Sequence, residues 1–228
     1  MSSLAVLGIA ALVWLFLHVV VAGSELRFWL IRRIGEQPFR GAFALASIAA
    51  LVFLVFAYRR APCAPLWTLS RDVAWLPVFV MPPAFVLLAG AFTVPNPTAV
   101  AAEAALKRAE PARGVLRVTR HPFLWAVVLW AGAHLLVNGN SASLLFFGTL
   151  LLTAALGTRS IDRKRARTHP EGWEAYRQRT SNLPFLALIQ RRNRLAVREL
   201  WLPIAIGAAL TLATLALHQP LFHVAPIP

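Results

Sequence analysis

The sequence predicts an all-α protein, a polytopic bundle of about six membrane-spanning helices. Hydrophobic residues make up 58% of the 228 residues and charged residues only 14%, and the mean hydropathy is +0.64. A chain of this composition is too apolar to fold as a soluble domain with a polar surface. The net charge of +14 arises from Lys and Arg residues that lie between apolar runs and never inside one. This placement is typical of loops at lipid headgroups, so we predict membrane lipids as partners and no nucleic-acid binding.

The apolar runs are long enough to cross a bilayer, which takes about 20 residues with some tolerance for shorter stretches. The expected spans are Leu4–Ala22, Ala42–Tyr58, Val73–Val94, Pro122–Val137, Ala142–Gly157 and Leu200–Leu217. The first is expected to be retained, because the N-terminal segment lacks the basic region of a cleavable signal peptide. Only Asn138-Gly139-Asn140-Ser141 separates the fourth span from the fifth, which predicts a tight turn and an antiparallel hairpin. We divide the chain into a membrane domain, 1–198, and a sixth span with a short tail, 199–228.

The loop charges predict the orientation. Of the 23 Lys and Arg residues, 20 lie in the first, third and fifth loops and three in the second. The positive-inside rule then places both termini outside the cytoplasm. For the bacterial inner membrane that we predict as the location, this side is the periplasm. The first loop, residues 24–40, alternates apolar and basic residues and is expected to lie along the headgroups as an amphipathic helix. The fifth loop is expected to form a cytoplasmic helix around Trp173 and Tyr176.

Two histidines, His18 and His134, are the candidate functional residues inside the spans, which contain no Asp, Glu, Lys or Arg. Each imidazole needs a partner in lipid. Two intramembrane histidines among aromatic residues meet the minimum for haem b, which takes axial nitrogen ligands in an apolar pocket. In the alternative interpretation each histidine lies near a span end and bonds to a carbonyl, water or lipid. We expect His169, His218 and His223 to be solvated.

A denser motif, residues 117–122, stands at the cytoplasmic entrance of the fourth span. Pro122 suits the first turn of a helix, and Arg120 is placed to meet a phosphate or carboxylate. The charged segments 162–164 and 171–177 lie on the same predicted side, so an anionic ligand between them is one interpretation. In the other, Arg120 only anchors the helix to headgroups.

Several motifs together, over roughly the first 190 residues, resemble the NnrU family. They are His18, Ser24-Glu25-Leu26-Arg27, Gly35-Glu36, Phe39-Arg40-Gly41, Tyr58, Ala61-Pro62, Leu66-Trp67, Thr119-Arg120-His121-Pro122, Leu124-Trp125, Leu129-Trp130, His134-Leu135 and Asn138-Gly139. That family is associated with denitrification, in nitric oxide and nitrite reduction or in expression of the reductases. It is similar to plant 15-cis-zeta-carotene isomerase, a membrane haem b enzyme. The resemblance implies haem b held by His18 and His134, with His121 as the Arg-His-Pro histidine. It implies either nitric oxide and nitrite metabolism or a haem-dependent isomerase-type redox reaction, on a small gas or a hydrophobic substrate.

The region from Arg120-His121-Pro122 through Glu174 and Tyr176 to Leu183-Pro184 also resembles isoprenylcysteine carboxyl methyltransferases. That resemblance implies S-adenosylmethionine binding and methyl transfer. Ile161-Asp162 stands where those enzymes typically carry paired glutamates. A third interpretation is a non-catalytic assembly or regulatory partner of a respiratory complex.

Helix geometry limits which histidines could share one iron. His121 and His134 are 13 positions apart, which is about 20 Å along a helix, so they cannot readily bind the same metal. In upright helices His18 and His134 differ in depth by roughly 15 Å. Helix tilt reduces this difference. The sequence therefore leaves two pairs open, His18 with His134 and His18 with His121.

Overall fold

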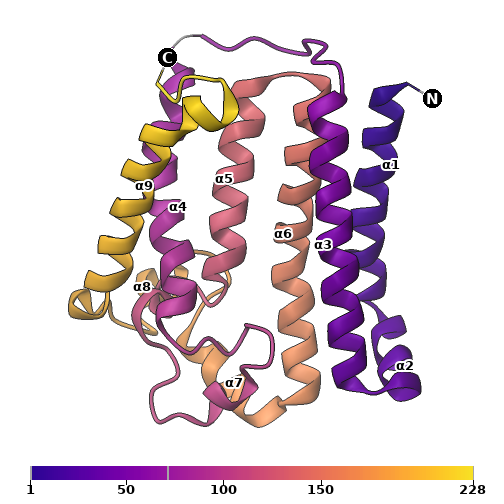
Figure 1. The fold of residues 1–228 in the computed structure, drawn as a ribbon. Coiled ribbons are helices and arrows are strands. Elements are labelled where there is room, and N and C mark those ends of the chain that lie inside the picture. Colours follow the sequence, from indigo (N-terminus) through magenta and orange to yellow (C-terminus); the bar gives the residue numbers. More distant parts are fainter. Residues whose placement is uncertain (1, 71, 228) are drawn as a thin grey trace. The chain divides into compact units, whose positions relative to one another are not determined.

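The computed structural model describes residues 2–70 and 72–227, most of them helical (Figure 1). Within these ranges the β pairing is limited to one isolated bridge, between Pro65 and Asn140. The all-α prediction is therefore confirmed. The helices form two compact units, and the helices α5 (Pro122–Asn138) and α6 (Ser141–Thr168) contribute to both. Unit 1 comprises residues 2–70 and 131–157, and unit 2 comprises residues 72–130 and 158–227.

Unit 1 contains the N-terminal helices. Its elements are α1 (Ser3–Leu15), the π-helical segment η1 (Phe16–Val21), α2 (Glu25–Ile34), α3 (Glu36–Arg60), the end of α5 (Pro122–Asn138) and the first part of α6 (Ser141–Thr168). Helix α1 packs on α3, and its buried residues Leu7, Ala10 and Ala11 include two alanines, which let helix backbones approach closely. The hydroxyl of Ser24 accepts from the Leu26 N–H and caps α2. The predicted helix in the first loop is thus confirmed.

The segment that follows α3, residues 61–67, lies across one end of unit 1, and we call this segment the strap. The N–H groups of Leu66 and Trp67 donate to the Gly139 carbonyl at 2.8 and 3.1 Å, and the Trp67 indole donates to the Leu136 carbonyl at 2.9 Å. Gly139 has a φ of +53°, and a Cβ there would collide with the Trp67 carbonyl oxygen. The predicted tight turn between α5 and α6 is confirmed, and glycine is required in it for two independent reasons.

Unit 2 contains the rest of the chain. Its elements are η2 (Val73–Trp75), α4 (Leu76–Thr93), η3 (Glu103–Lys107), η4 (Gly114–Arg117), the start of α5, the end of α6, α7 (Pro170–Arg179), α8 (Leu186–Ile189), η5 (Val197–Glu199) and α9 (Trp201–Phe222). Helices α4 and α9 pack together at Gly207, where a Cβ would lie 2.8 Å from the backbone nitrogen of Val86. The absent side chain lets the two helices meet closely. Helix α7 confirms the predicted helix of the fifth loop.

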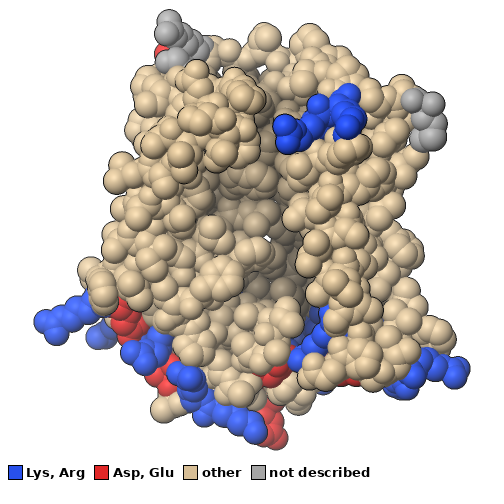
Figure 2. Space-filling view, viewed as in Figure 1, with Lys and Arg blue, Asp and Glu red and all other residues tan. Residues whose placement is uncertain are grey.

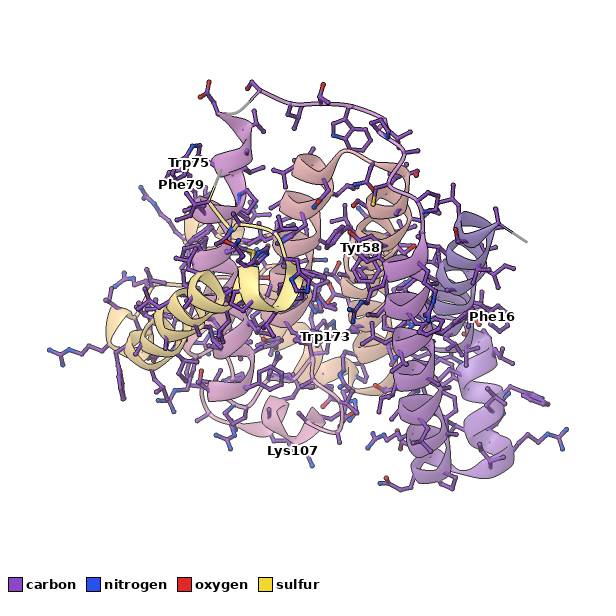
Figure 3. All side chains as sticks on the ribbon, turned by 45° about the horizontal axis from the view of Figure 1, so that its top comes forward. Phe16, Tyr58, Trp75, Phe79, Lys107 and Trp173 are labelled. Carbon is purple, nitrogen blue, oxygen red and sulfur yellow. The ribbon has the colours of Figure 1, made fainter. Side chains whose placement is uncertain are left out.

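Five helices of the described chain are long and apolar enough to cross a membrane, and α5 is a shorter apolar helix of 17 residues. Together they match the six predicted spans. Large apolar side chains such as Phe79 (72% exposed, Figure 3) and Leu212 (68%) point away from their units, as lipid contact requires. In unit 2 the basic side chains visible in Figure 2 gather at the lower end of the view, the end at which Figure 1 shows α7. The periplasmic placement of the termini and the domain boundary at residue 199 stay predictions.

Candidate functional site

His18 lies in η1, the π-helical continuation of α1. Short π segments inside α-helices occur frequently at functional sites. The Nδ1 atom of His18 is 2.9 Å from the carbonyl oxygen of Trp14. Because a carbonyl only accepts, Nδ1 carries the proton and donates, and Nε2 keeps its lone pair. This is the arrangement by which metal-binding histidines are oriented, with one nitrogen tied down and the other available to the metal.

Aromatic rings surround the His18 imidazole. Trp14 stacks on it with ring centroids 4.0 Å apart, and Phe43 meets it edge-on at 5.4 Å. The Trp14 indole donates to the Thr153 hydroxyl at 3.0 Å, which fixes the indole against α6. The half-buried imidazole is therefore held in a defined orientation between apolar rings. Such a setting suits a flat, apolar cofactor with a metal at its centre.

His134 belongs to the same unit and lies near the end of α5 that the strap covers. Its ring is half-buried and stacks on Phe147 at 5.3 Å. Phe147 packs against Phe146, which in turn stacks on Tyr58 at 4.5 Å. The Asn138 amide donates to the His134 carbonyl at 2.7 Å and secures the last turn of the helix. Both candidate ligands of unit 1 are thus set among aromatic side chains.

The contacts on α6 indicate the relative depth of these two histidines. His134 stacks on Phe147, whereas His18 stacks on Trp14, which bonds to Thr153. Six residues separate these two contact points on α6, which is about 9 Å along the helix axis. The His134 ring and the Trp14 ring, which stacks on His18, thus contact α6 at levels about 9 Å apart, whereas upright helices predict roughly 15 Å between the two histidines. The lean of helical side chains toward the N-terminus of their own helix contributes to this difference.

His121 lies in unit 2, and its surroundings are of another kind. Its Nε2 lies 2.7 Å from Oδ1 of Asp162, and the side chain is fully buried. Arg120 donates to the same carboxylate through Nε and Nη2. Burial lowers the pKa of His121 despite the opposing effect of Asp162, so the imidazole is neutral at pH 7. Nε2 is then the donor to Asp162, and Nδ1 has no hydrogen-bond partner in the described chain.

Helix α7 completes this cluster with two buried aromatic side chains. The Arg120 guanidinium lies 5.7 Å from the centre of the Trp173 ring, a cation–π distance. The Tyr176 hydroxyl has no hydrogen-bond partner among the described residues, and burial raises its pKa. The Arg120 fork is therefore occupied by a carboxylate and an aromatic face within the protein. The carboxylate that Arg120 meets is thus one of the protein's own, that of Asp162, and an additional anionic ligand stays a prediction.

The four residues proposed from the sequence thus separate into two groups. His18 and His134 lie in unit 1 among aromatic rings, whereas Arg120 and His121 lie in unit 2 in an ion-pair network. Sequence reasoning missed the supporting residues Trp14, Phe43 and Phe147. Only Trp14 carried a signal, because it stands four positions before His18 and therefore on the same helix face.

Comparison with known proteins adds the following. The family model described as NnrU protein matches residues 6–226. The 15-cis-zeta-carotene isomerase of Zea mays is 30% identical over 169 residues, covering 71% of this chain and 45% of the isomerase. The corresponding Arabidopsis thaliana protein is 30% identical over 167 residues, covering 70% of this chain and 44% of its own length. The chain therefore spans less than half the length of these relatives. No solved structure matches it.

Proposed function

We propose, from the premise that this chain belongs to the NnrU family, that it binds haem b in unit 1 and uses it in an isomerase-type redox reaction on a hydrophobic substrate. The observation that supports this most directly is the His18 ring. Its Nδ1–H is tied to the Trp14 carbonyl, and its Nε2 makes no hydrogen bond in the described chain. His134 is the second proposed ligand, because it lies in the same unit and also among aromatic rings.

The donor set fits this cofactor. Imidazole nitrogens are common axial ligands of haem iron, and apolar surroundings control its redox potential. Bound haem would supply an iron that can change between the ferric and ferrous states. The protein would contribute orientation: Trp14 holds His18, and Asn138 and Trp67 secure the helix turn that carries His134.

The relatives suggest the substrate class. The two curated proteins are named as isomerases of a carotene, which is a long apolar polyene. A substrate of that kind reaches a membrane site from the lipid phase, consistent with a site inside apolar helices. The family association with nitric oxide and nitrite metabolism stays a second proposal, since an open position on haem iron also accepts a small gas.

Absorption spectroscopy of detergent-purified protein from haem-supplemented cells tests the proposal. We expect a Soret band in the wild type that is lost in His18→Ala and strongly reduced or shifted in His134→Ala. His218→Ala is the matched control, because His218 is likewise half-buried and bonded through Nδ1 to a carbonyl but belongs to unit 2, and it should leave the band unchanged. A colourless wild-type preparation, or a band that survives in both His18→Ala and His134→Ala, would contradict haem binding by this pair.

A second candidate is supported by the two buried atoms without partners, Nδ1 of His121 and the hydroxyl of Tyr176. Buried polar atoms are usually satisfied, so each one invites a ligand or an ordered water. They lie in the region similar to methyltransferases, and calorimetric titration with S-adenosylmethionine tests that alternative. If neither haem nor S-adenosylmethionine binds, the remaining proposal is a non-catalytic assembly or regulatory partner of a respiratory complex.

A further inference from the structure

The segment around α8 in unit 2 exposes large apolar side chains although it lies outside the membrane spans. Leu183 and Phe185 are each 55% exposed, and Ile189 is 74% exposed. The same short segment continues into Arg191, Arg192 and Arg194. We name these six residues the α8 patch. Exposed apolar residues beside arginines are the composition of a surface that lies in the headgroup region of a bilayer.

The three arginines of the α8 patch have no acidic partner in the described part of the chain, which distinguishes them from their neighbours. Arg177 pairs with Glu174, and Arg179 pairs with Glu110. The neighbouring ion pairs therefore leave the charge of the α8 patch uncompensated. An uncompensated cluster of three cations attracts an anionic partner.

The backbone holds the α8 patch in a fixed shape. Phe185 and Arg191 both have positive φ values, +64° and +56°, which residues other than glycine rarely adopt. The Phe185 N–H donates to the Val118 carbonyl at 2.8 Å, and the Arg192 N–H donates to the Ala187 carbonyl at 2.9 Å. This segment is therefore tied to the rest of unit 2 in a strained but specified conformation.

Arg192 is the best-positioned cation of the α8 patch. Its Nη1 donates to the carbonyls of Gln178 and Thr180 at 2.6 and 2.8 Å, while its Nη2 makes no hydrogen bond within the described residues. It lines an open pocket of about 450 Å³ together with Arg177, Leu183 and Leu186. A rigidly held guanidinium with free N–H groups beside leucines offers one surface to an anion and another to a hydrocarbon chain.

We propose that this pocket and the α8 patch bind the headgroup of an anionic phospholipid. Arg192 contacts the phosphate, and Leu183 and Phe185 contact the first part of the acyl chains. Charge supports this occupant over a zwitterionic lipid, because three unpaired arginines favour a net negative headgroup. Apolar exposure supports a lipid over a free phosphate ion, because a soluble anion would leave Phe185 and Ile189 in water.

The test measures thermal unfolding and lipid binding of the full chain in a neutral detergent. Phosphatidylglycerol and phosphatidylcholine with identical acyl chains are the probes, and inorganic phosphate is a third arm. We expect phosphatidylglycerol to raise the melting temperature more than phosphatidylcholine, and to be retained in native mass spectra. We expect Arg192→Gln to weaken phosphatidylglycerol binding about fivefold, as for the loss of one cation at a membrane surface.

Two further variants keep the result interpretable. Because Arg192 also caps α7, its substitution could disturb the fold, so Arg191→Gln combined with Arg194→Gln removes charge without removing a side-chain hydrogen bond of the described chain. This pair should also weaken phosphatidylglycerol binding, whereas Arg59→Gln, an exposed arginine of unit 1, should not. Equal effects of the two lipids, equal stabilisation by inorganic phosphate, or an equal loss in Arg59→Gln would each overturn the proposal.

Discussion

The two units hold their polar groups in opposite ways. Unit 2 buries an ion pair, in which Arg120 and His121 both bind the Asp162 carboxylate. In unit 1, by contrast, the His18 imidazole is oriented by a backbone carbonyl and aromatic rings, which leave one nitrogen with its lone pair. Charged side chains that bind one another stabilise a fold and are less available to bind a ligand. An oriented imidazole that keeps one lone pair in an apolar setting is available to a metal, and for this reason we propose that the cofactor binds in unit 1.

The largest effect should come from breaking the ion-pair network of unit 2. Asp162→Ala leaves Arg120 buried without a carboxylate, and the loss of one partner of a buried pair costs about 3–5 kcal/mol of unfolding free energy. Denaturant titration in mixed micelles measures it. The matched control is Glu174→Gln, which removes an acid from a solvent-exposed pair with Arg177 and should cause no measurable change. Equal unfolding free energies of the two variants would show that the Asp162 ion pairs do not stabilise the fold.

The next largest loss of stability should come from disturbing the strap of unit 1. The strap is held by backbone geometry, whereas the cluster of unit 2 is held by charge. Gly139→Ala places a Cβ against the Trp67 carbonyl at a residue with φ of +53°. Strain of this kind costs about 2 kcal/mol or more. Gly148→Ala is the control, because its Cβ would meet only ordinary contact at 3.9 Å inside α6 and should be neutral or slightly stabilising. If Gly139→Ala is as stable as Gly148→Ala, the strap does not constrain this turn.

These two predictions also show what the sequence could and could not reveal. Hydropathy located all six apolar helices, because the bilayer dictates their length and composition. It could not show that Asp162 meets Arg120, which is 42 positions away, because that contact depends on α6 continuing past its apolar part to Thr168. The π-helical turn at His18 was equally hidden, since Phe16–Val21 has the same apolar composition as ordinary helix. The histidines could be chosen from the sequence, but their hydrogen-bond partners could not.

A smaller effect should appear in the pH dependence of stability. Burial lowers the pKa of His121 below the value of about 6.5 that it has when unfolded. The unfolded chain therefore binds a proton more readily, and the contribution of His121 is complete above that pH and is lost as the pH falls through it. The slope can reach about 1.4 kcal/mol per pH unit. We expect His121→Asn to show a flatter profile than wild type between pH 7.5 and 5.5, and parallel profiles would contradict a buried neutral imidazole.

The smallest effect compares one tyrosine from each unit. The Tyr58 hydroxyl of unit 1 bonds to the Ser143 hydroxyl at 3.2 Å, whereas the Tyr176 hydroxyl of unit 2 has no partner among the described residues. Tyr58→Phe should therefore cost about 1 kcal/mol, and Tyr176→Phe should be neutral or stabilising because it removes an unsatisfied group. Paired unfolding titrations measure both. If Tyr176→Phe is the more costly substitution, a water or ligand must bond to the Tyr176 hydroxyl. The cluster around Asp162 in unit 2 would then be a binding site and not only a set of stabilising ion pairs.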